Sequence, residues 1–214
     1  MKKIKTIDEV MKFIKDGMTI SVGGFIGVGT PEKLIDAIVA KGIKNITLIA
    51  NDTSTPTTGV GKLIVNKNCK KVIVSHIGTN AETQRQMNTK ELEVELVPQG
   101  TLIERIRSAG AGLGGVLTPT GIGTIVEEGK RKIEIDCKEY LLELPLRADV
   151  ALILGGIVDK RGNVYFNKAT RNFNPIIATA ADIVIVQAEK LVEIGEIDQS
   201  DVMTPSIFVN YIVQ

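Results

Sequence analysis

The 214-residue sequence has no tryptophan, one histidine and two cysteines, and these scarcities exclude several kinds of site. A Ser-His-Asp or Cys-His catalytic arrangement would have to be built around His76, whose place after a strand-like apolar run favours a structural role. Cys69 and Cys137 have neither CxxC spacing nor histidine neighbours, so they form a poor metal site. We expect no metal, and two reduced cysteines that pack as small apolar residues.

An excess of charge of one sign and long apolar runs are also missing. Lysine and arginine number 26 against 25 acidic residues, for a formal net charge of +1. Bulk charge therefore gives no reason to expect nucleic acid or an anionic membrane as a partner. No apolar run approaches the roughly 18 residues of a membrane-spanning helix, and lysines occupy the N-terminal stretch where a signal peptide needs its apolar core. We expect a cytoplasmic protein.

What the sequence does have is a series of short apolar runs rich in β-branched residues, at residues 18–22, 46–50, 71–77, 92–97, 150–156 and 183–188. Helical patterns separate several of them, including residues 31–41 and 101–109. Such an alternation predicts an α/β fold, with a mostly parallel open sheet and helices on both faces.

Capping residues predict where two of the helices begin and end. Thr6 starts a capping box, and the helix after it is expected to run to about Lys15. Thr30 is expected to be the N-cap of the next helix, with Pro31 at its first position, and Gly42 marks the end of that helix.

One stretch breaks the alternation of strands and helices. From residue 110 to about residue 146, glycine-rich turns lead into KIEIDCKEYLLELPL, which predicts a pair of antiparallel strands and hence a small β flap. Residues 159–163 predict a hairpin turn. A chain of this length can form one large domain. We therefore expect residues 1–214 to be a single domain with a small β subdomain around residues 110–146.

The first apolar run leads into a loop with four glycines among residues 23–29, directly before a helix. A strand, a glycine loop and a helix in this order let free backbone N–H groups and the helix dipole face an anion. Glycine also lets a ligand approach the backbone closely. The spacing matches neither G-x-G-x-x-G nor the P-loop. A ligand-binding loop and a tight turn that serves packing alone both remain open.

A second glycine cluster, GAGLGG at residues 110–115, does match G-x-G-x-x-G. A helical pattern precedes it and Pro119 follows it, whereas a dinucleotide-binding fold needs a strand before the motif and a helix after it. We therefore predict a structural turn or a mobile loop here.

Several motifs together resemble a known family. Residues 16–31, DGMTISVGGFIGVGTP, are similar to the first signature of the class I (3-oxoacid) CoA-transferases. Ser21 departs from the hydrophobic residue usual at its position. Four further segments of the chain resemble sequences of the same family: residues 78–87, 91–112, 118–124 and 162–174. Length and motif order resemble the α, or A, subunit of the two-subunit enzymes that act on acetoacetate, butyrate or acetate.

The family's second signature, S-E-N-G with the glutamate nucleophile, does not occur in this sequence. The resemblance therefore implies a half-enzyme whose β subunit carries the nucleophile, in an assembly such as α2β2. It implies ping-pong transfer of CoA through a glutamyl-CoA thioester, between acetoacetyl-CoA or butyryl-CoA and an acid such as acetate or butyrate. CoA would be substrate and carrier, with no other cofactor.

The resemblance also suggests site residues. Gln99, directly after a predicted strand, falls at the position of an oxyanion-hole glutamine, whose amide donates to the developing negative charge. For Phe25, packing in the core is as good an explanation as a role in binding CoA. Glu82 and Glu104 lie in helical patterns, where surface or ion-pair roles are commoner than a nucleophile's. The glycine loop resembles part of the family's CoA site, which here implies Gly24, Phe25, Ile26, Gly27, Val28, Gly29 and Thr30.

Two other functions remain open at this point. A sugar-phosphate isomerase or a related α/β enzyme would bind phosphate at the glycine loop and would need a general base in this chain. Activity of the purified chain alone would favour it. A CoA-sensing or purely structural subunit would bind CoA without transferring it, even with its partner present.

Overall fold

The computed structural model describes residues 3–214 as strands joined by short helices. The strands are β1 (Thr19–Val22), β2 (Ile46–Ile49), β3 (Cys69–Val74), β4 (Glu93–Leu96), β5 (Val116–Thr118), β6 (Lys132–Ile135), β7 (Lys138–Glu143), β8 (Ala148–Asp159), β9 (Val164–Tyr165), β10 (Ala181–Val192) and β11 (Tyr211–Val213). The α-helices are α1 (Ile7–Val10), α2 (Glu32–Lys41), α3 (Gly61–Val65), α4 (Ala81–Asn88), α5 (Gln99–Gly110) and α6 (Asn174–Ile177). The 3₁₀ helices are η1 (Met11–Phe13), η2 (Ile125–Glu127), η3 (Lys168–Arg171), η4 (Gln199–Asp201) and η5 (Ser206–Phe208).

The main sheet has the strand order β11-β10-β8-β1-β2-β3-β4, and all of these neighbours pair in parallel. Ile20 in β1 lies in register between Leu48 of β2 and Val150 of β8. β9 adds an antiparallel hairpin to β8 through the turn at residues 159–163, as predicted. The mostly parallel α/β sheet is confirmed.

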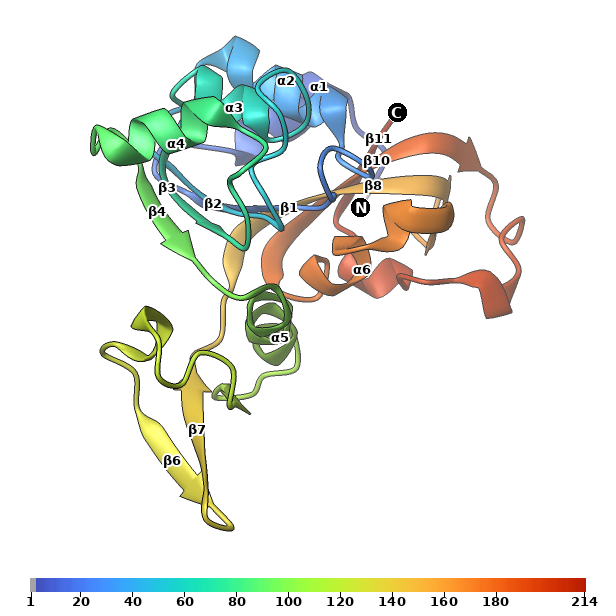
Figure 1. The fold of residues 1–214 in the computed structure, drawn as a ribbon. Coiled ribbons are helices and arrows are strands. Elements are labelled where there is room, and N and C mark those ends of the chain that lie inside the picture. Colours follow the sequence, from blue (N-terminus) through green and yellow to red (C-terminus); the bar gives the residue numbers. More distant parts are fainter. Residues whose placement is uncertain (1–2) are drawn as a thin grey trace.

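Helices cover both faces of this sheet, and two separate cores result. On one face, Leu48 packs with residues of α1, α2 and α3. On the other face, its neighbour Ile49 packs with residues of α5 and α6. Figure 1 shows these two helical layers on opposite sides of the strands. Because successive strand residues point to opposite faces, a strand covered on both sides must be apolar at nearly every position.

The flap is present, but it has three antiparallel strands in the order β5-β7-β6, because β5 adds to the predicted pair β6 and β7. It projects away from the main sheet beyond α5 (Figure 1). Asp136 and Cys137 form its hairpin turn with φ of 50° and 60°, the positive values that a two-residue hairpin turn needs. The turn leaves Cys137 exposed. The prediction that both cysteines pack in the interior is therefore wrong for Cys137 and confirmed for Cys69.

Several element ends differ from the sequence predictions. The capping box at Thr6 is present, but α1 ends at Val10 and the 3₁₀ helix η1 continues it only to Phe13, because Ile14 adopts extended backbone. Pro31, and not Thr30, occupies the N-cap position of α2. Thr30 still belongs to the preceding loop, since its N–H donates to the carbonyl of Gly27.

Strand lengths also differ from prediction. β8 and β10 extend beyond the predicted runs, and β3 begins and ends earlier than residues 71–77. β11 was not predicted from the sequence, because its three residues are too few for a reliable pattern.

Candidate functional site

The candidate site residues gather at the carboxyl edge of the parallel sheet. The glycine loop (residues 23–30) follows β1, Asn51 and Asp52 follow β2, His76 follows β3, and Gln99 follows β4 as the first residue of α5. The chain proceeds from β1 to β4 on one side of β1, while β8 lies on its other side. Ligands of open α/β sheets bind at the carboxyl ends of strands where the order reverses in this way. The glycine loop lies at that point.

The glycine loop is a tight turn with its apolar side chains outward. Phe25 and Val28 exchange backbone hydrogen bonds of 3.0 and 2.9 Å. The two residues between them, Ile26 and Gly27, have φ of 48° and 84°, the positive values of a type I′ turn. Phe25 is 44% exposed and Val28 is 50% exposed. The alternative of Phe25 as a core residue is therefore wrong, because the turn directs its side chain to the surface.

Most N–H groups of the glycine loop bond within the protein. Gly23 donates to the carbonyl of Leu152 in β8, Gly24 to Asn172 and Ile26 to Asp52, while Phe25, Val28 and Thr30 donate within the loop itself. Among the described residues, the N–H groups of Gly27 and Gly29 have no partner. The loop therefore offers an incoming group fewer free donors than its glycine content suggests.

Two asparagines from the far end of the chain hold the glycine loop in place. Asn172 Oδ1 accepts the N–H of Gly24 at 3.1 Å, and its Nδ2 donates to the carbonyl of Val28 at 2.9 Å. The buried Asn174 donates to the carbonyl of Gly29 at 2.9 Å. Both ends of the turn are thereby tied to the segment around α6. At Gly29, a Cβ atom would lie 3.0 Å from the backbone of Thr170, so glycine permits this close approach.

Gln99 is joined to the glycine loop by a chain of side-chain hydrogen bonds. Its Nε2 donates to Asn51 Oδ1 at 2.7 Å, and Asn51 Nδ2 donates to Asp52 Oδ2 at 2.6 Å. The same Asp52 oxygen accepts the N–H of Ile26 at 2.9 Å. Gln99 itself is exposed, whereas Asn51 and Asp52 are 2% and 4% exposed. The structure therefore brings both groups of predicted site residues together around a buried polar pair.

His76 lies at the same edge of the sheet. Its backbone pairs with Asp52, and its side chain is exposed. Within residues 3–214, its ring makes no hydrogen bond to a carboxylate, serine or cysteine. Cys69 lies at the opposite end of the same strand, as the sequence spacing indicated. The arrangement offers no His-based nucleophile pair.

The other potential nucleophiles, Glu82, Glu104 and Cys69, either form ion pairs or lie in the interior. Two hydrogen bonds from Arg85 hold the pKa of Glu82 down at about 2, well below its ordinary value. Glu104 pairs with Arg107 one turn later on α5. Burial raises the pKa of the Cys69 thiol to about 12, so its reactive thiolate is strongly disfavoured. These groups are poor candidates for covalent chemistry.

The second glycine cluster is a turn, as predicted. The helix α5 runs into it and the short strand β5 follows it, which is the reverse of the order that a dinucleotide site requires. Gly110 packs against the turn that follows α6, where an added Cβ would lie 2.1 Å from Thr179 Oγ1. The cluster therefore packs two helices together and changes the chain direction toward the flap.

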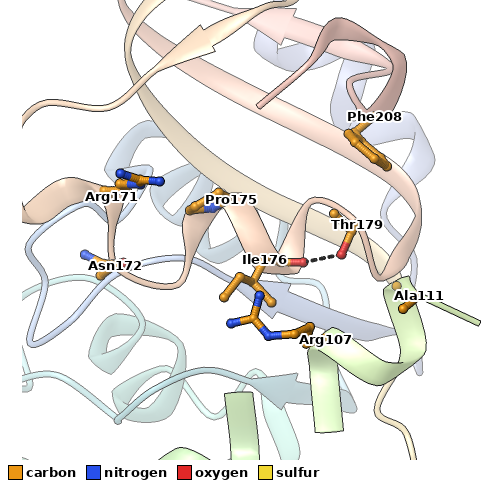
Figure 2. A pocket seen from close by; sticks show the side chains of 9 residues that line it. Arg107, Ala111, Arg171, Asn172, Pro175, Ile176, Thr179 and Phe208 are labelled. Carbon is orange, nitrogen blue, oxygen red and sulfur yellow. Dashed lines mark hydrogen bonds between the residues drawn. The ribbon is translucent and has the colours of Figure 1, made fainter. Parts of the chain in front are cut away.

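A cavity of about 690 Å³ lies between the C-terminal end of α5 and α6, next to the anchored glycine loop. Figure 2 shows Arg107 and Arg171 on its walls, with Asn172 beside Arg171. Arg107 is bonded to Glu104, while Arg171 has no ion-pair partner among the described residues. Guanidinium groups bind phosphate and carboxylate well. The cavity can accept an anionic group.

Four residues of the site were not predicted from the sequence: Asn51, Asp52, Asn172 and Asn174. Asn51 and Asp52 directly follow an apolar strand, which is a recognisable signal for the carboxyl edge of a parallel sheet. The segment RNFN around Asn172 has no such signal, because its loop partners lie about 145 residues earlier in the chain.

Residues 3–214 lack two kinds of feature. No helix there combines the length and the apolar character required to cross a bilayer. No group of three or more His, Cys, Asp and Glu side chains is arranged to hold a metal ion in the same residues.

Comparison with known proteins identifies the family. A sequence model described as coenzyme A transferase matches residues 4–214. The chain belongs to the coenzyme A transferase family. This CoA-transferase chain is 56% identical to the "Acetoacetyl-CoA:acetate/butyrate CoA transferase alpha subunit" of Clostridium acetobutylicum, over 99% of the chain and 97% of the relative. It is 54% identical to the "Acetate CoA-transferase subunit alpha" of Escherichia coli, over 99% of the chain and 96% of the relative.

Solved structures share the fold of this CoA-transferase chain. Glutaconate coenzyme A-transferase from Acidaminococcus fermentans superposes with a TM-score of 0.88 at 19% identity, over 99% of this chain and 75% of that one. An acyl-CoA transferase from Escherichia coli O157:H7, solved as a thioester complex with CoA, gives 0.87 at 23% identity over 98% of this chain. The chain spans 46% of that larger protein. The resemblance seen in the sequence motifs is confirmed at the level of family and fold.

Proposed function

We propose that this chain is the α subunit of a heteromeric CoA-transferase that moves CoA from acetoacetyl-CoA or butyryl-CoA to a carboxylic acid such as acetate or butyrate. Identity of 56% and 54% to α subunits with names of this kind supports the substrate class. The observation that carries the proposal is the placement of Gln99 beside the glycine loop at the carboxyl edge of the sheet, through Asn51 and Asp52.

The proposed reaction uses a glutamate carboxylate of a β subunit as nucleophile. This carboxylate attacks the thioester carbonyl of the acyl-CoA, and the CoA thiolate leaves to give an acyl anhydride. The thiolate then attacks the glutamyl carbonyl of the anhydride and releases the first carboxylate, which yields glutamyl-CoA. A second carboxylate reverses these two steps and takes up CoA. Each attack produces a tetrahedral oxyanion.

Gln99 is the proposed oxyanion donor. It is exposed at the edge where a ligand would bind, and one N–H of its amide is bonded to Asn51, which leaves the second available. A neutral amide can donate without acting as a competing acid. Removal of one such donor typically lowers kcat by about 10² to 10³.

The glycine loop is the proposed contact for the non-reacting part of CoA. Its unbonded N–H group at Gly27, a partly exposed residue, suits a carbonyl or anionic oxygen. Its exposed side chains, Phe25, Ile26 and Val28, suit the apolar stretches of a pantetheine arm. Binding energy from this remote part of the substrate can be used at the thioester.

The proposal also covers the subunit composition of the enzyme. Relatives are named as α subunits, which supports a β partner, and we propose an α2β2 heteromer in the cytoplasm. We further propose that the chain acts as one domain, with residues 110–146 as its flap. CoA is substrate and carrier in this scheme, and no other cofactor is required.

The test is acetoacetyl-CoA consumption with acetate or butyrate, for this chain alone and for the chain co-expressed with its β partner. We expect activity only when both chains are present. The complex that carries Gln99→Ala should have a kcat about 10² to 10³-fold lower than that of the wild type. Gln199→Ala, at another exposed glutamine, should leave kcat unchanged. Transfer by the single chain would show that a nucleophile lies within it and would refute the half-enzyme. Wild-type kcat for Gln99→Ala would refute the role of Gln99.

A further inference from the structure

A buried Asn-Asp pair links the two halves of the proposed site. Asn51 and Asp52 lie just beyond the carboxyl end of β2, between the glycine loop after β1 and Gln99 after β4. We infer that Asp52, acting through Asn51, is a positioning device that orients the carboxamide of Gln99 and holds the glycine loop in register with it. This inference rests on the proposed function of Gln99, and neither residue is placed in contact with substrate.

The direction of the hydrogen-bond chain follows from the chemistry of its members. A carboxylate accepts hydrogen bonds and donates none, so the group that faces Asp52 Oδ2 at 2.6 Å must be the Nδ2 of Asn51. Asn51 Oδ1 then points the other way and can only accept.

This direction selects one of two orientations of the Gln99 carboxamide. With Nε2 toward Asn51 Oδ1 at 2.7 Å, one N–H is bonded and the other remains free to donate. If the carboxamide were flipped, two oxygen atoms would face each other beside a buried pair, and the hydrogen bond would be lost. Without Asn51, both orientations of an exposed amide become accessible, and one of them presents the wrong atom to an oxyanion.

Asp52 holds the glycine loop by the same carboxylate. Its Oδ2 accepts the N–H of Ile26, and its Oδ1 accepts the N–H of Ser54 at 2.7 Å. Ile26 has φ of 48°, a left-handed conformation that a β-branched residue rarely adopts. Such conformations persist where surrounding contacts impose them. Asp52 supplies one of these contacts, so a change at this carboxylate disturbs both halves of the site.

The experiment is a double-mutant cycle in the complete α/β enzyme, with acetoacetyl-CoA and acetate. Asn51→Ala should lower kcat about tenfold, which is the effect of one lost hydrogen bond of ordinary strength, and leave KM for acetoacetyl-CoA within about twofold. In the Gln99→Ala background, Asn51→Ala should cause no further fall in kcat, because the group that it positions is gone. Asp52→Ala should lower kcat and also raise KM, since the glycine loop loses its anchor at Ile26 and Asn51 loses its acceptor.

Two further variants control for folding. Asn68 is also a buried asparagine whose amide donates to a backbone carbonyl, that of Ile43 at 2.7 Å, but it lies at the amino end of β3. Asn68→Ala should lower stability without changing kcat of the folded enzyme. If Asn51→Ala does not fold, Asn51→Ser is measured in its place, because the serine side chain is too short to reach Gln99.

The outcomes separate this inference from the proposed function. If Asn51→Ala lowers kcat equally in the wild type and in the Gln99→Ala background, the inference is overturned. It is also overturned if Asn51→Ala raises KM and leaves kcat unchanged, because that result would indicate direct contact with substrate. Wild-type kcat for the Asn51 variant with a strongly impaired Gln99→Ala would overturn the inference alone. Wild-type kcat for Gln99→Ala would overturn the proposed function first.

Discussion

Two helix glycines make a matched pair whose alanine substitutions should have opposite effects. Gly61 begins α3 and Gly100 is the second residue of α5, and neither has a positive φ. Alanine is favoured over glycine in helices by up to about 1 kcal/mol. On helix propensity alone, both substitutions would stabilise the protein.

The surroundings of the two glycines reverse this expectation at one of them. A Cβ at Gly61 would lie 1.8 Å from the backbone carbonyl oxygen of Thr55, a group that cannot rotate away. A Cβ at Gly100 would meet no atom within 4 Å. Overpacking typically costs about 1 to 3 kcal/mol. We expect Gly61→Ala to lower the free energy of unfolding by about this amount and Gly100→Ala to raise it by up to about 1 kcal/mol.

Differential scanning calorimetry at one fixed protein concentration measures this difference, since association makes Tm depend on concentration. For a chain of this size, 1 kcal/mol corresponds to a Tm shift of about 2 to 4 °C. Gly61→Ala should therefore lower Tm by about 2 to 12 °C, and Gly100→Ala should raise it by up to about 4 °C. An equal or higher Tm for Gly61→Ala would show that the contact with Thr55 relaxes freely and would refute the packing argument.

Two further predictions concern the loop anchors and acid stability. Asn172→Ala removes both hydrogen bonds to the turn ends at Gly24 and Val28. In steady-state assays, KM for acyl-CoA should therefore rise several-fold while kcat stays nearly the same. An unchanged KM would contradict the anchoring role. Arg85 lowers the pKa of Glu82 to about 2. This pair therefore makes its full contribution to the free energy of unfolding when the pH is above the ordinary pKa of glutamate, and that contribution is lost as pH falls from about 4.5 toward 2. Over that range Tm of the wild type should fall more than Tm of Glu82→Gln, and parallel curves would count against the pairing.

Prediction from the sequence succeeded where the signal is periodic or local. Apolar runs at nearly every residue indicated strands buried on both faces, and the two cores above and below the sheet confirm this. The flap hairpin was also predicted from its alternating pattern. Its turn was not recognised, because Asp136 and Cys137 are unusual at positions that need positive φ, and the exposure of Cys137 was missed with it.

The candidate site was predicted in part. The glycine loop and Gln99 came from motifs, and the structure places them at one edge of the sheet. The direction of Phe25 was left open, since a positive φ at Ile26 cannot be read from an apolar sequence. The cap of α2 was placed one residue early for a similar reason, because Thr30 is held in the loop by a contact with Gly27.

Features that depend on neighbours a few residues away were determined by the sequence itself. These are the strand and helix pattern, the capping box at Thr6 and the end of α2 at Gly42. Contacts between distant segments were decided by the tertiary structure alone. Asn172 reaches Gly24 across 148 residues, and Gln99 reaches Asn51 across 48. The physical reason is that a hydrogen bond or a steric contact depends on distance in space, and the packing of strands and helices around one sheet sets that distance.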